Sequence, residues 1–96
     1  MIVGYADEAT RDVHTGVESR AARRFGADVR AVARRKLDLI GAAADIGDLA
    51  VPPGNRLEKL KGRLAGFYSI RVNDQFRIIF RFQEGQASQV QIVDYH

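Results

Sequence analysis

The hydrophobic pattern changes its period near the middle of the chain, and this change constrains the fold more than any other feature. From about Ala27 to Ala44, apolar side chains recur at helical spacing, namely at Val29, Ala33, Leu37, Ile40 and Ala44. Pro52 and Pro53 cannot continue a helix. After Asn55, apolar and polar residues alternate instead, which is the period of a strand. The sequence therefore predicts helices followed by an antiparallel meander joined by tight turns.

The N-terminal half contains further local signals. Residues 1–6 alternate weakly and are expected to form a short strand. Asp7 is a suitable N-cap for a helix that runs to about Gly16, and Asp45 is a suitable cap for a short turn that ends at Leu49. His14 fits no functional pattern and is expected to be a surface residue.

The register of the first hairpin follows because core side chains must face core side chains. A two-residue loop at 73–74 would place Ile70 opposite Arg77, whereas a three-residue loop through Gln75 places it opposite Ile78. The other pairs predicted by this loop are Val72 with Phe76 and Tyr68 with Phe80.

The same reasoning applies to the second hairpin. It predicts a three-residue loop of Glu84, Gly85 and Gln86. Val90 then faces Phe80, and Ile92 faces Ile78.

The opposite face of this sheet gathers cations. In this register Arg71 lies directly across from Arg77, Arg81 follows four residues later on the same strand and face, and Tyr95 falls on that face too. Like charges directly opposite one another destabilise a sheet, so the pair predicts an anion site. The alternative is that each arginine pairs with a nearby carboxylate.

Composition narrows the class of protein. With 96 residues, we expect a single domain spanning 1–96, and with no cysteine there is no disulfide. The N-terminus lacks the features of a signal peptide, and no apolar run could span a bilayer, so we expect a cytoplasmic protein without a membrane partner. Residues 1–50 hold eight Lys or Arg and eight Asp or Glu, whereas residues 51–96 hold seven and four. This basic half suits a polyanion such as nucleic acid, or is simply a solvated surface.

Three segments of the basic half are distinctive in combination. They are Asn55–Gly62 (NRLEKLKG), Ser69–Arg81 (SIRVNDQFRIIFR) and Val93–His96 (VDYH). Together they resemble the HigB branch of the RelE/ParE toxin superfamily. The resemblance implies a compact α+β fold, with N-terminal helices packed on one face of the antiparallel meander. It also implies a toxin of a type II toxin–antitoxin system, with a HigA-like antitoxin as partner.

The activity implied by the resemblance is ribosome-dependent cleavage of mRNA in the A site, without a metal or another cofactor. The family's active-site lysine corresponds to Lys61, its central-strand arginine to Arg77, and its C-terminal tyrosine and histidine to Tyr95 and His96. Some relatives have a histidine where this chain has Glu58. The general base therefore stays open among Glu58, Lys61 and Tyr95.

Metal-free RNA cleavage needs a base for the 2′-OH, cations for the phosphate, and an acid for the 5′-oxygen. Arg77 is the strongest assignment, because a guanidinium is always charged and can contact two phosphate oxygens. Glu58 could accept the proton, or it merely balances Lys59 or Lys61. The expected RNA-binding residues are Arg56, Lys59, Arg63, Arg71 and Arg81, which would hold backbone phosphates.

Two other functions fit the same sequence. A ParE-like toxin would poison DNA gyrase without catalysis, and would not need Lys61, Arg77, Tyr95 and His96 together. A small basic nucleic-acid-binding domain would have no toxicity, so harmless expression without an antitoxin would favour it.

Overall fold

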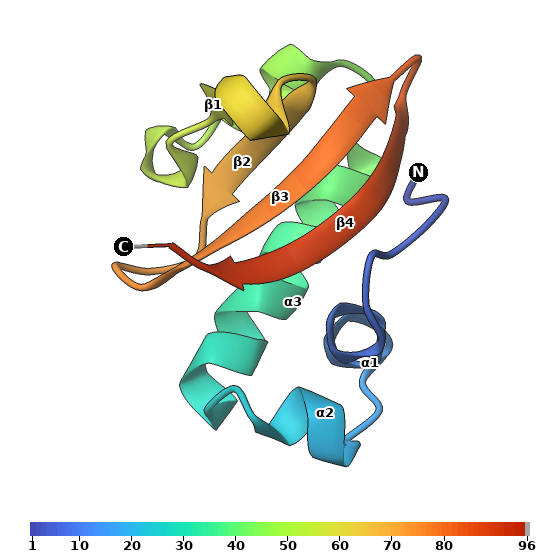
Figure 1. Cartoon of the computed structure of the whole chain (residues 1–96), viewed down its shortest axis with the longest axis vertical. Coiled ribbons are helices and arrows are strands. Elements are labelled where there is room, and N and C mark those ends of the chain that lie inside the picture. The colour runs from blue at the N-terminus through green and yellow to red at the C-terminus, as the bar shows by residue number, and fades with distance from the viewer. Residues whose placement is uncertain (96) are drawn as a thin grey trace.

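The computed structural model describes residues 1–95, and it shows helices followed by a four-stranded antiparallel sheet (Figure 1). The helices are α1 (Glu8–Thr15), α2 (Arg20–Arg23) and α3 (Ala27–Ala42). Three short 3-10 turns follow, η1 (Ile46–Ala50), η2 (Pro53–Asn55) and η3 (Gly62–Leu64). The strands are β1 (Glu58–Lys59), β2 (Phe67–Arg71), β3 (Phe76–Gln83) and β4 (Gln86–Asp94), in the spatial order β1-β2-β3-β4. The expected α+β architecture is confirmed.

The helix boundaries agree with the local signals. The Asp7 side chain accepts a hydrogen bond from the backbone nitrogen of Thr10 at 2.8 Å, and α1 ends at Gly16, which has a left-handed φ of 80°. The short α2 was not predicted, although Ser19 caps it through its hydroxyl. Within residues 1–95, no helix combines the length and the hydropathy needed to cross a membrane.

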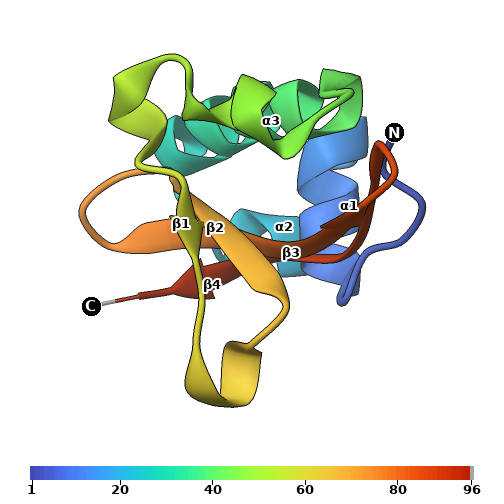
Figure 2. The ribbon, with the colours of Figure 1, turned by 90° about the horizontal axis from the view of Figure 1, so that it is seen from above.

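The core lies between α3 and the inner face of the sheet (Figure 2). The fully buried side chains at its centre are Leu37 and Ile40 from α3 and Ile70, Ile78 and Phe80 from the strands. Ala44 is exposed and Ala43 is buried instead, because α3 already ends at Ala42. The helix α1 packs against α3, α2 and β4. The helices α1, α2 and α3 therefore leave the other face of the sheet to the segments around β1.

The N-terminal segment follows the outer edge of β4. It makes two isolated parallel bridges, Ile2 with Ala87 and Tyr5 with Val90, rather than the predicted strand. The amide of Val3 donates to the carbonyl of Ala87 at 2.8 Å. This contact covers an edge that would otherwise expose unpaired backbone groups.

His14 is not the isolated surface residue that we expected. Its Nδ1 lies 2.5 Å from the hydroxyl of Tyr5, and its Nε2 lies 2.8 Å from a carboxylate oxygen of Asp38. The side chain of His14 therefore links the N-terminal segment, α1 and α3.

The register of the first hairpin is confirmed. Tyr68 pairs with Phe80, Ile70 with Ile78, and Arg71 with Arg77. The Asn73 side chain accepts hydrogen bonds from the amides of Gln75 and Phe76, which stabilises the turn.

The loop predicted for the second hairpin is wrong. Gln83 pairs with Gln86, so the turn holds only Glu84 and Gly85. Both residues have a positive φ, which two-residue hairpin turns need in order to match the twist of the strands. The register shifts between Ile79 and Arg81, and Gln89 on the facing strand has a φ of 50°. This irregularity absorbs one residue. The expected pairing of Ile92 with Ile78 is consequently correct.

Candidate active site

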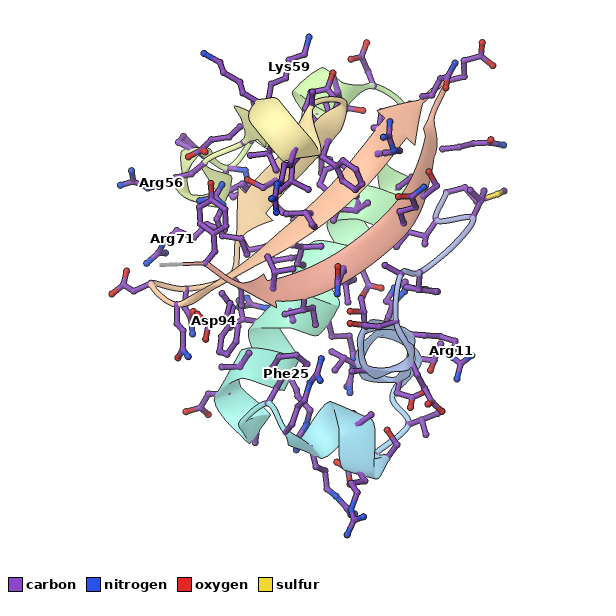
Figure 3. The ribbon with its side chains drawn as sticks, viewed as in Figure 1. Arg11, Phe25, Arg56, Lys59, Arg71 and Asp94 are labelled. Carbon is purple, nitrogen blue, oxygen red and sulfur yellow. The ribbon has the colours of Figure 1, made fainter. Side chains whose placement is uncertain are left out.

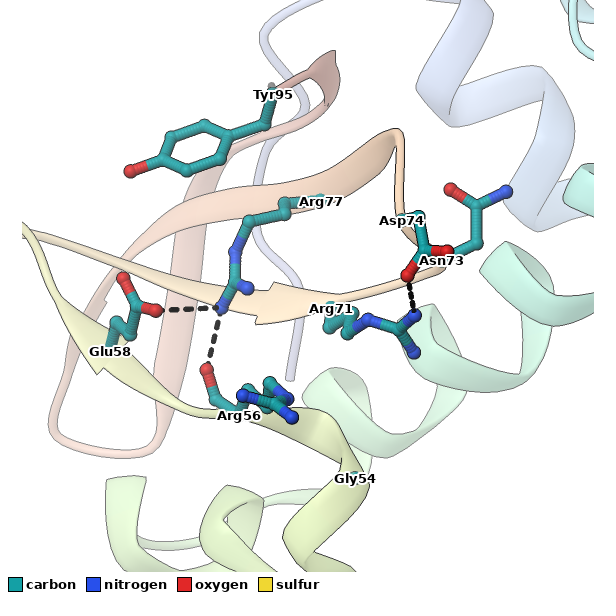
Figure 4. A pocket seen from close by; sticks show the side chains of 8 residues that line it. All are labelled: Gly54, Arg56, Glu58, Arg71, Asn73, Asp74, Arg77 and Tyr95. Carbon is teal, nitrogen blue, oxygen red and sulfur yellow. Dashed lines mark hydrogen bonds and ion pairs between the residues drawn. The ribbon is translucent and has the colours of Figure 1, made fainter.

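A cavity of about 500 Å³ lies where the open face of the sheet meets the turn that follows η2 (Figure 4). Its lining residues are Gly54, Arg56, Glu58, Arg71, Asn73, Asp74, Arg77 and Tyr95. Three arginines thus face two carboxylates, which leaves an excess of positive charge. Within residues 1–95, no three His, Cys, Asp or Glu side chains come close enough to share a metal ion.

Arg77 is the best-held cation in this cavity. It lies on β3 and is only 7% exposed. Its Nε donates to Ser69 Oγ at 2.9 Å, and its Nη2 donates to the carbonyl oxygens of Arg56 at 2.6 Å and Ser69 at 3.4 Å. All three acceptors are neutral. The guanidinium is therefore fixed in position without losing its charge.

The two facing arginines are accommodated in different ways. Arg71 pairs with the exposed carboxylate of Asp74, three residues later, so for Arg71 the alternative of a nearby acid is correct. The nearest carboxylate to Arg77 is Glu58, at 3.9 Å between Nη2 and Oε1, which is beyond hydrogen-bonding distance. Arg77 and Glu58 therefore form an ion pair without a hydrogen bond.

Tyr95 lies beside Arg77 at the end of β4. The guanidinium carbon of Arg77 is 5.6 Å from the centre of the Tyr95 ring, within the range of a cation–π contact. The backbone nitrogen of Tyr95 donates to the carbonyl of Gln75 at 2.7 Å, which fixes the chain there. The side chain is 43% exposed, and its hydroxyl makes no hydrogen bond to any residue in 1–95. The phenol is therefore available to a ligand in the cavity.

The opposite wall of the cavity comes from the segment between η2 and β1. Glu58 pairs with Ser69 in the β1–β2 ladder, which brings its carboxylate to the same face as Arg77. Arg56 has a left-handed backbone conformation, with φ 47° and ψ 54°. In this conformation its carbonyl oxygen accepts the hydrogen bond from Nη2 of Arg77. Figure 4 shows Glu58 and the Arg56 carbonyl converging on one nitrogen of Arg77.

Asn55 anchors this wall from inside the protein. It is fully buried, and its Nδ2 donates to the carbonyls of Leu49 at 3.2 Å and Val51 at 3.5 Å. Its Oδ1 accepts a hydrogen bond from Lys36 on α3. Burial lowers the pKa of Lys36, and the charges of Arg35 and Arg71 lower it further.

The structure brings together five of the predicted site residues, namely Arg56, Glu58, Arg71, Arg77 and Tyr95. Four others do not line the cavity. Lys59, Lys61 and Arg63 are exposed, and their side chains make no hydrogen bond or ion pair within residues 1–95. Figure 3 shows Lys59 pointing outward, away from Arg56 and Arg71. Arg81 stacks over Phe67, with 4.6 Å from its guanidinium carbon to the ring centre. His96 lies outside the described residues.

Sequence reasoning missed three positions of the candidate site. Asn73 and Asp74 line the cavity, although the sequence suggested only that they form a turn. Ser69 is fully buried and accepts a hydrogen bond from Arg77. The predicted register already contained a signal for it, because Ser69 shares the outer face of its strand with Arg71.

The overall arrangement matches solved toxin structures. The YoeB–YefM complex from Staphylococcus aureus contains a chain that superposes with a TM-score of 0.65 at 19% identity, covering 100% of this chain and 95% of that one. A heterotetrameric YoeB–YefM toxin–antitoxin complex from the same organism gives a TM-score of 0.61, also at 19% identity. At such identity the likeness concerns the fold alone. The chain therefore has the RelE-like toxin fold.

Sequence comparison defines the family more narrowly. The sequence-family model of the HigB-like toxins, described as the RelE-like toxin HigB of type II toxin–antitoxin systems, matches residues 10–96. Toxin HigB-1 of Vibrio cholerae is 53% identical over 53 residues, 55% of this chain and 56% of that protein. An uncharacterized protein of Haemophilus influenzae is 44% identical over 57 residues, 59% of this chain and 56% of that protein. The match thus spans a little over half the length of these relatives. The chain belongs to the HigB-like family of RelE-like toxins.

Proposed function

We propose that the protein is the toxin of a type II toxin–antitoxin system and acts as a ribosome-dependent, metal-independent endoribonuclease that cleaves mRNA in the A site. The observation that carries this proposal is the state of Arg77. Its guanidinium is held by neutral acceptors at the wall of an open cavity, with Tyr95 and Glu58 beside it. A fixed cation in a partly buried site is well suited to stabilise charge that develops on a phosphate.

In the proposed reaction, the 2′-oxygen of one nucleotide attacks the adjacent phosphorus, and the bond from phosphorus to the 5′-oxygen breaks. The 2′-OH gives its proton to a base, and an acid protonates the leaving 5′-oxygen. The products are a 2′,3′-cyclic phosphate and a 5′-hydroxyl end. The 2′-OH requirement restricts the reaction to RNA.

Within this scheme, Arg77 contacts the phosphate, and Arg56 and Arg71 position the neighbouring backbone. Glu58, Lys61 and Tyr95 remain the proposed alternatives for the base, and His96 is a proposed acid. Geometry supports Glu58 and Tyr95 over Lys61, because both line the cavity and Lys61 does not. Lys59, Arg63 and Arg81 are proposed to contact RNA outside the cavity.

We also propose a HigA-like antitoxin protein as partner. The support is family membership together with a fold shared with chains of YoeB–YefM complexes. Co-expression with a HigA-like antitoxin should yield a stable complex and relieve growth arrest. Growth arrest that persists despite co-expression of the antitoxin would contradict the partnership.

The decisive experiment maps mRNA 5′ ends on ribosomes for the wild type and for Arg77 variants. Arg77→Lys keeps a positive charge but loses the fork that binds Ser69 and Arg56, and Arg77→Ala removes both. We expect cleavage to fall by about 100- to 1,000-fold in Arg77→Ala. Arg11→Ala is the matched control, since Arg11 lies on α1, far from Arg56 and Arg71 (Figure 3).

Circular dichroism and thermal melting should verify that each variant is folded. Undiminished cleavage by folded Arg77→Ala would refute the site. Growth arrest by DNA damage while translation continues would instead support a gyrase-poisoning toxin.

A further inference from the structure

We propose that Ser69 is a positioning residue for Arg77. It fixes the guanidinium so that a single nitrogen, Nη1, is presented to a phosphate in the cavity. This inference rests on the proposed function only in identifying the ligand as a phosphate. The orientation of Arg77 itself can be tested without any cleavage assay.

The hydrogen bonds of Arg77 account for only part of its donor capacity. A guanidinium has five N–H groups. The single N–H of Nε is used by Ser69 Oγ at 2.9 Å, and Nη2 contacts the carbonyls of Arg56 and Ser69 at 2.6 Å and 3.4 Å. Within residues 1–95, Nη1 donates to no acceptor.

This arrangement changes the expected mode of phosphate binding. A bidentate grip through Nε and Nη2, or through Nη1 and Nη2, would require breaking a bond that the protein already makes. The two N–H groups of Nη1 are available without that cost. The phosphate is therefore expected to meet one end of the guanidinium, on the cavity side.

Ser69 is specifically suited to hold Arg77 in this way. It contributes two acceptors to one guanidinium, its hydroxyl and its carbonyl oxygen, and it is 0% exposed. Water cannot readily replace a hydroxyl at a position with no solvent access. The β1–β2 ladder fixes Ser69 from the other side, where it pairs with Glu58.

Alanine at this position should release Nε while leaving the strand in place. Ser69→Ala removes one acceptor, so Arg77 loses a hydrogen bond that a rigid site provides before the ligand arrives. We expect the cleavage rate at saturating substrate to fall about tenfold, which corresponds to about 1.4 kcal/mol. KM should change less, because Nη1 and the other cations still attract RNA.

The first test is an NMR measurement on the free protein. In the wild type, the Nε–H proton of Arg77 should give a resolved signal that exchanges slowly with water. Ser69→Ala should shift this signal and increase its exchange rate at least tenfold while the backbone amide spectrum is retained. Ser88→Ala is the matched control, because Ser88 is a half-buried serine on β4 whose side chain makes no hydrogen bond within residues 1–95. An unchanged Arg77 signal in folded Ser69→Ala would overturn the proposal.

The second test separates positioning from a general structural effect. Ser69→Ala is introduced into the wild type and into Arg77→Lys, which has no guanidinium to orient. Cleavage should fall about tenfold in the first background and less than twofold in the second. An equal loss in both backgrounds would overturn the positioning role.

If the wild type cleaves no RNA, the proposed function fails, and the NMR test still decides whether Ser69 orients Arg77.

Discussion

Asn55 should contribute more to stability than its place in an irregular segment suggests. Its side chain joins three parts of the protein, namely η1 through Leu49, the following residue Val51, and α3 through Lys36. It is fully buried beside the backbone of Arg56, which forms the cavity wall. We therefore expect Asn55→Ala to destabilise both the fold and the site.

The magnitude follows from the hydrogen bonds that are lost. A buried polar group left without a partner costs about 1–3 kcal/mol, and a weaker bond at 3.5 Å adds less than about 1 kcal/mol. The amine of Lys36 is partly exposed and can turn to water. Asn55→Ala should thus lower the free energy of unfolding by about 2–4 kcal/mol. For a domain of this size, the melting temperature should fall by roughly 10–30 °C.

Two further variants identify which bond matters. Asn55→Asp keeps an acceptor for Lys36 but cannot donate to Leu49 or Val51, so it should be at least as destabilising as Asn55→Ala. Lys36→Met keeps the packing of the side chain but leaves the buried Oδ1 of Asn55 without its donor, so it should cost about 1–3 kcal/mol.

Urea denaturation at neutral pH measures all three variants. A loss below about 1 kcal/mol for Asn55→Ala would refute the reasoning. So would an Asn55→Asp variant as stable as the wild type.

Three other substitutions test the fold. Ile78→Ala removes a fully buried side chain at the centre of β3 and should cost about 2–5 kcal/mol in urea denaturation. Gly66→Ala should cost about 1–3 kcal/mol, seen as a lower melting temperature, because Gly66 has a φ of 94° and a new Cβ would lie 2.8 Å from Nη1 of Arg81. Burial and the charge of Asp38 raise the pKa of Tyr5. The folded state therefore favours the neutral phenol, and this stabilisation, complete below the unfolded pKa of about 10, is lost as pH rises through the higher folded value. The stability advantage over Tyr5→Phe should thus be constant below about pH 9 and shrink as the pH rises above about 10, and an advantage independent of pH would contradict this.

Alternation along the strands was enough to predict the first hairpin, because one face of the sheet is buried. A shift of one residue would have put Ile70 opposite Arg77 instead of Ile78. The second hairpin failed because the same rule assumes a constant register. The irregularity near Gln89 lets a two-residue turn coexist with the pairing of Ile78 and Ile92.

The candidate site was predictable where it depends on strand register, and not elsewhere. Arg71 and Arg77 were placed correctly because they sit on regular strands. The roles of Asn55 and of the Arg56 carbonyl depend on a left-handed residue and on 3-10 turns that leave no periodic pattern in the sequence. His14 was misjudged for a related reason, since its partners come from segments distant in the chain.

The strand register places Arg71 directly opposite Arg77, and the two positive charges repel each other. Pairing both side chains with carboxylates would remove the repulsion, but it would also cancel the charge that an anion site needs. The protein neutralises Arg71 with Asp74 and holds Arg77 with a serine and backbone carbonyls. Dipoles fix a cation in place while leaving its net charge intact. We therefore propose that Ser69 and Arg56 together orient the Arg77 guanidinium toward the cavity, with Glu58 as a looser ion-pair partner.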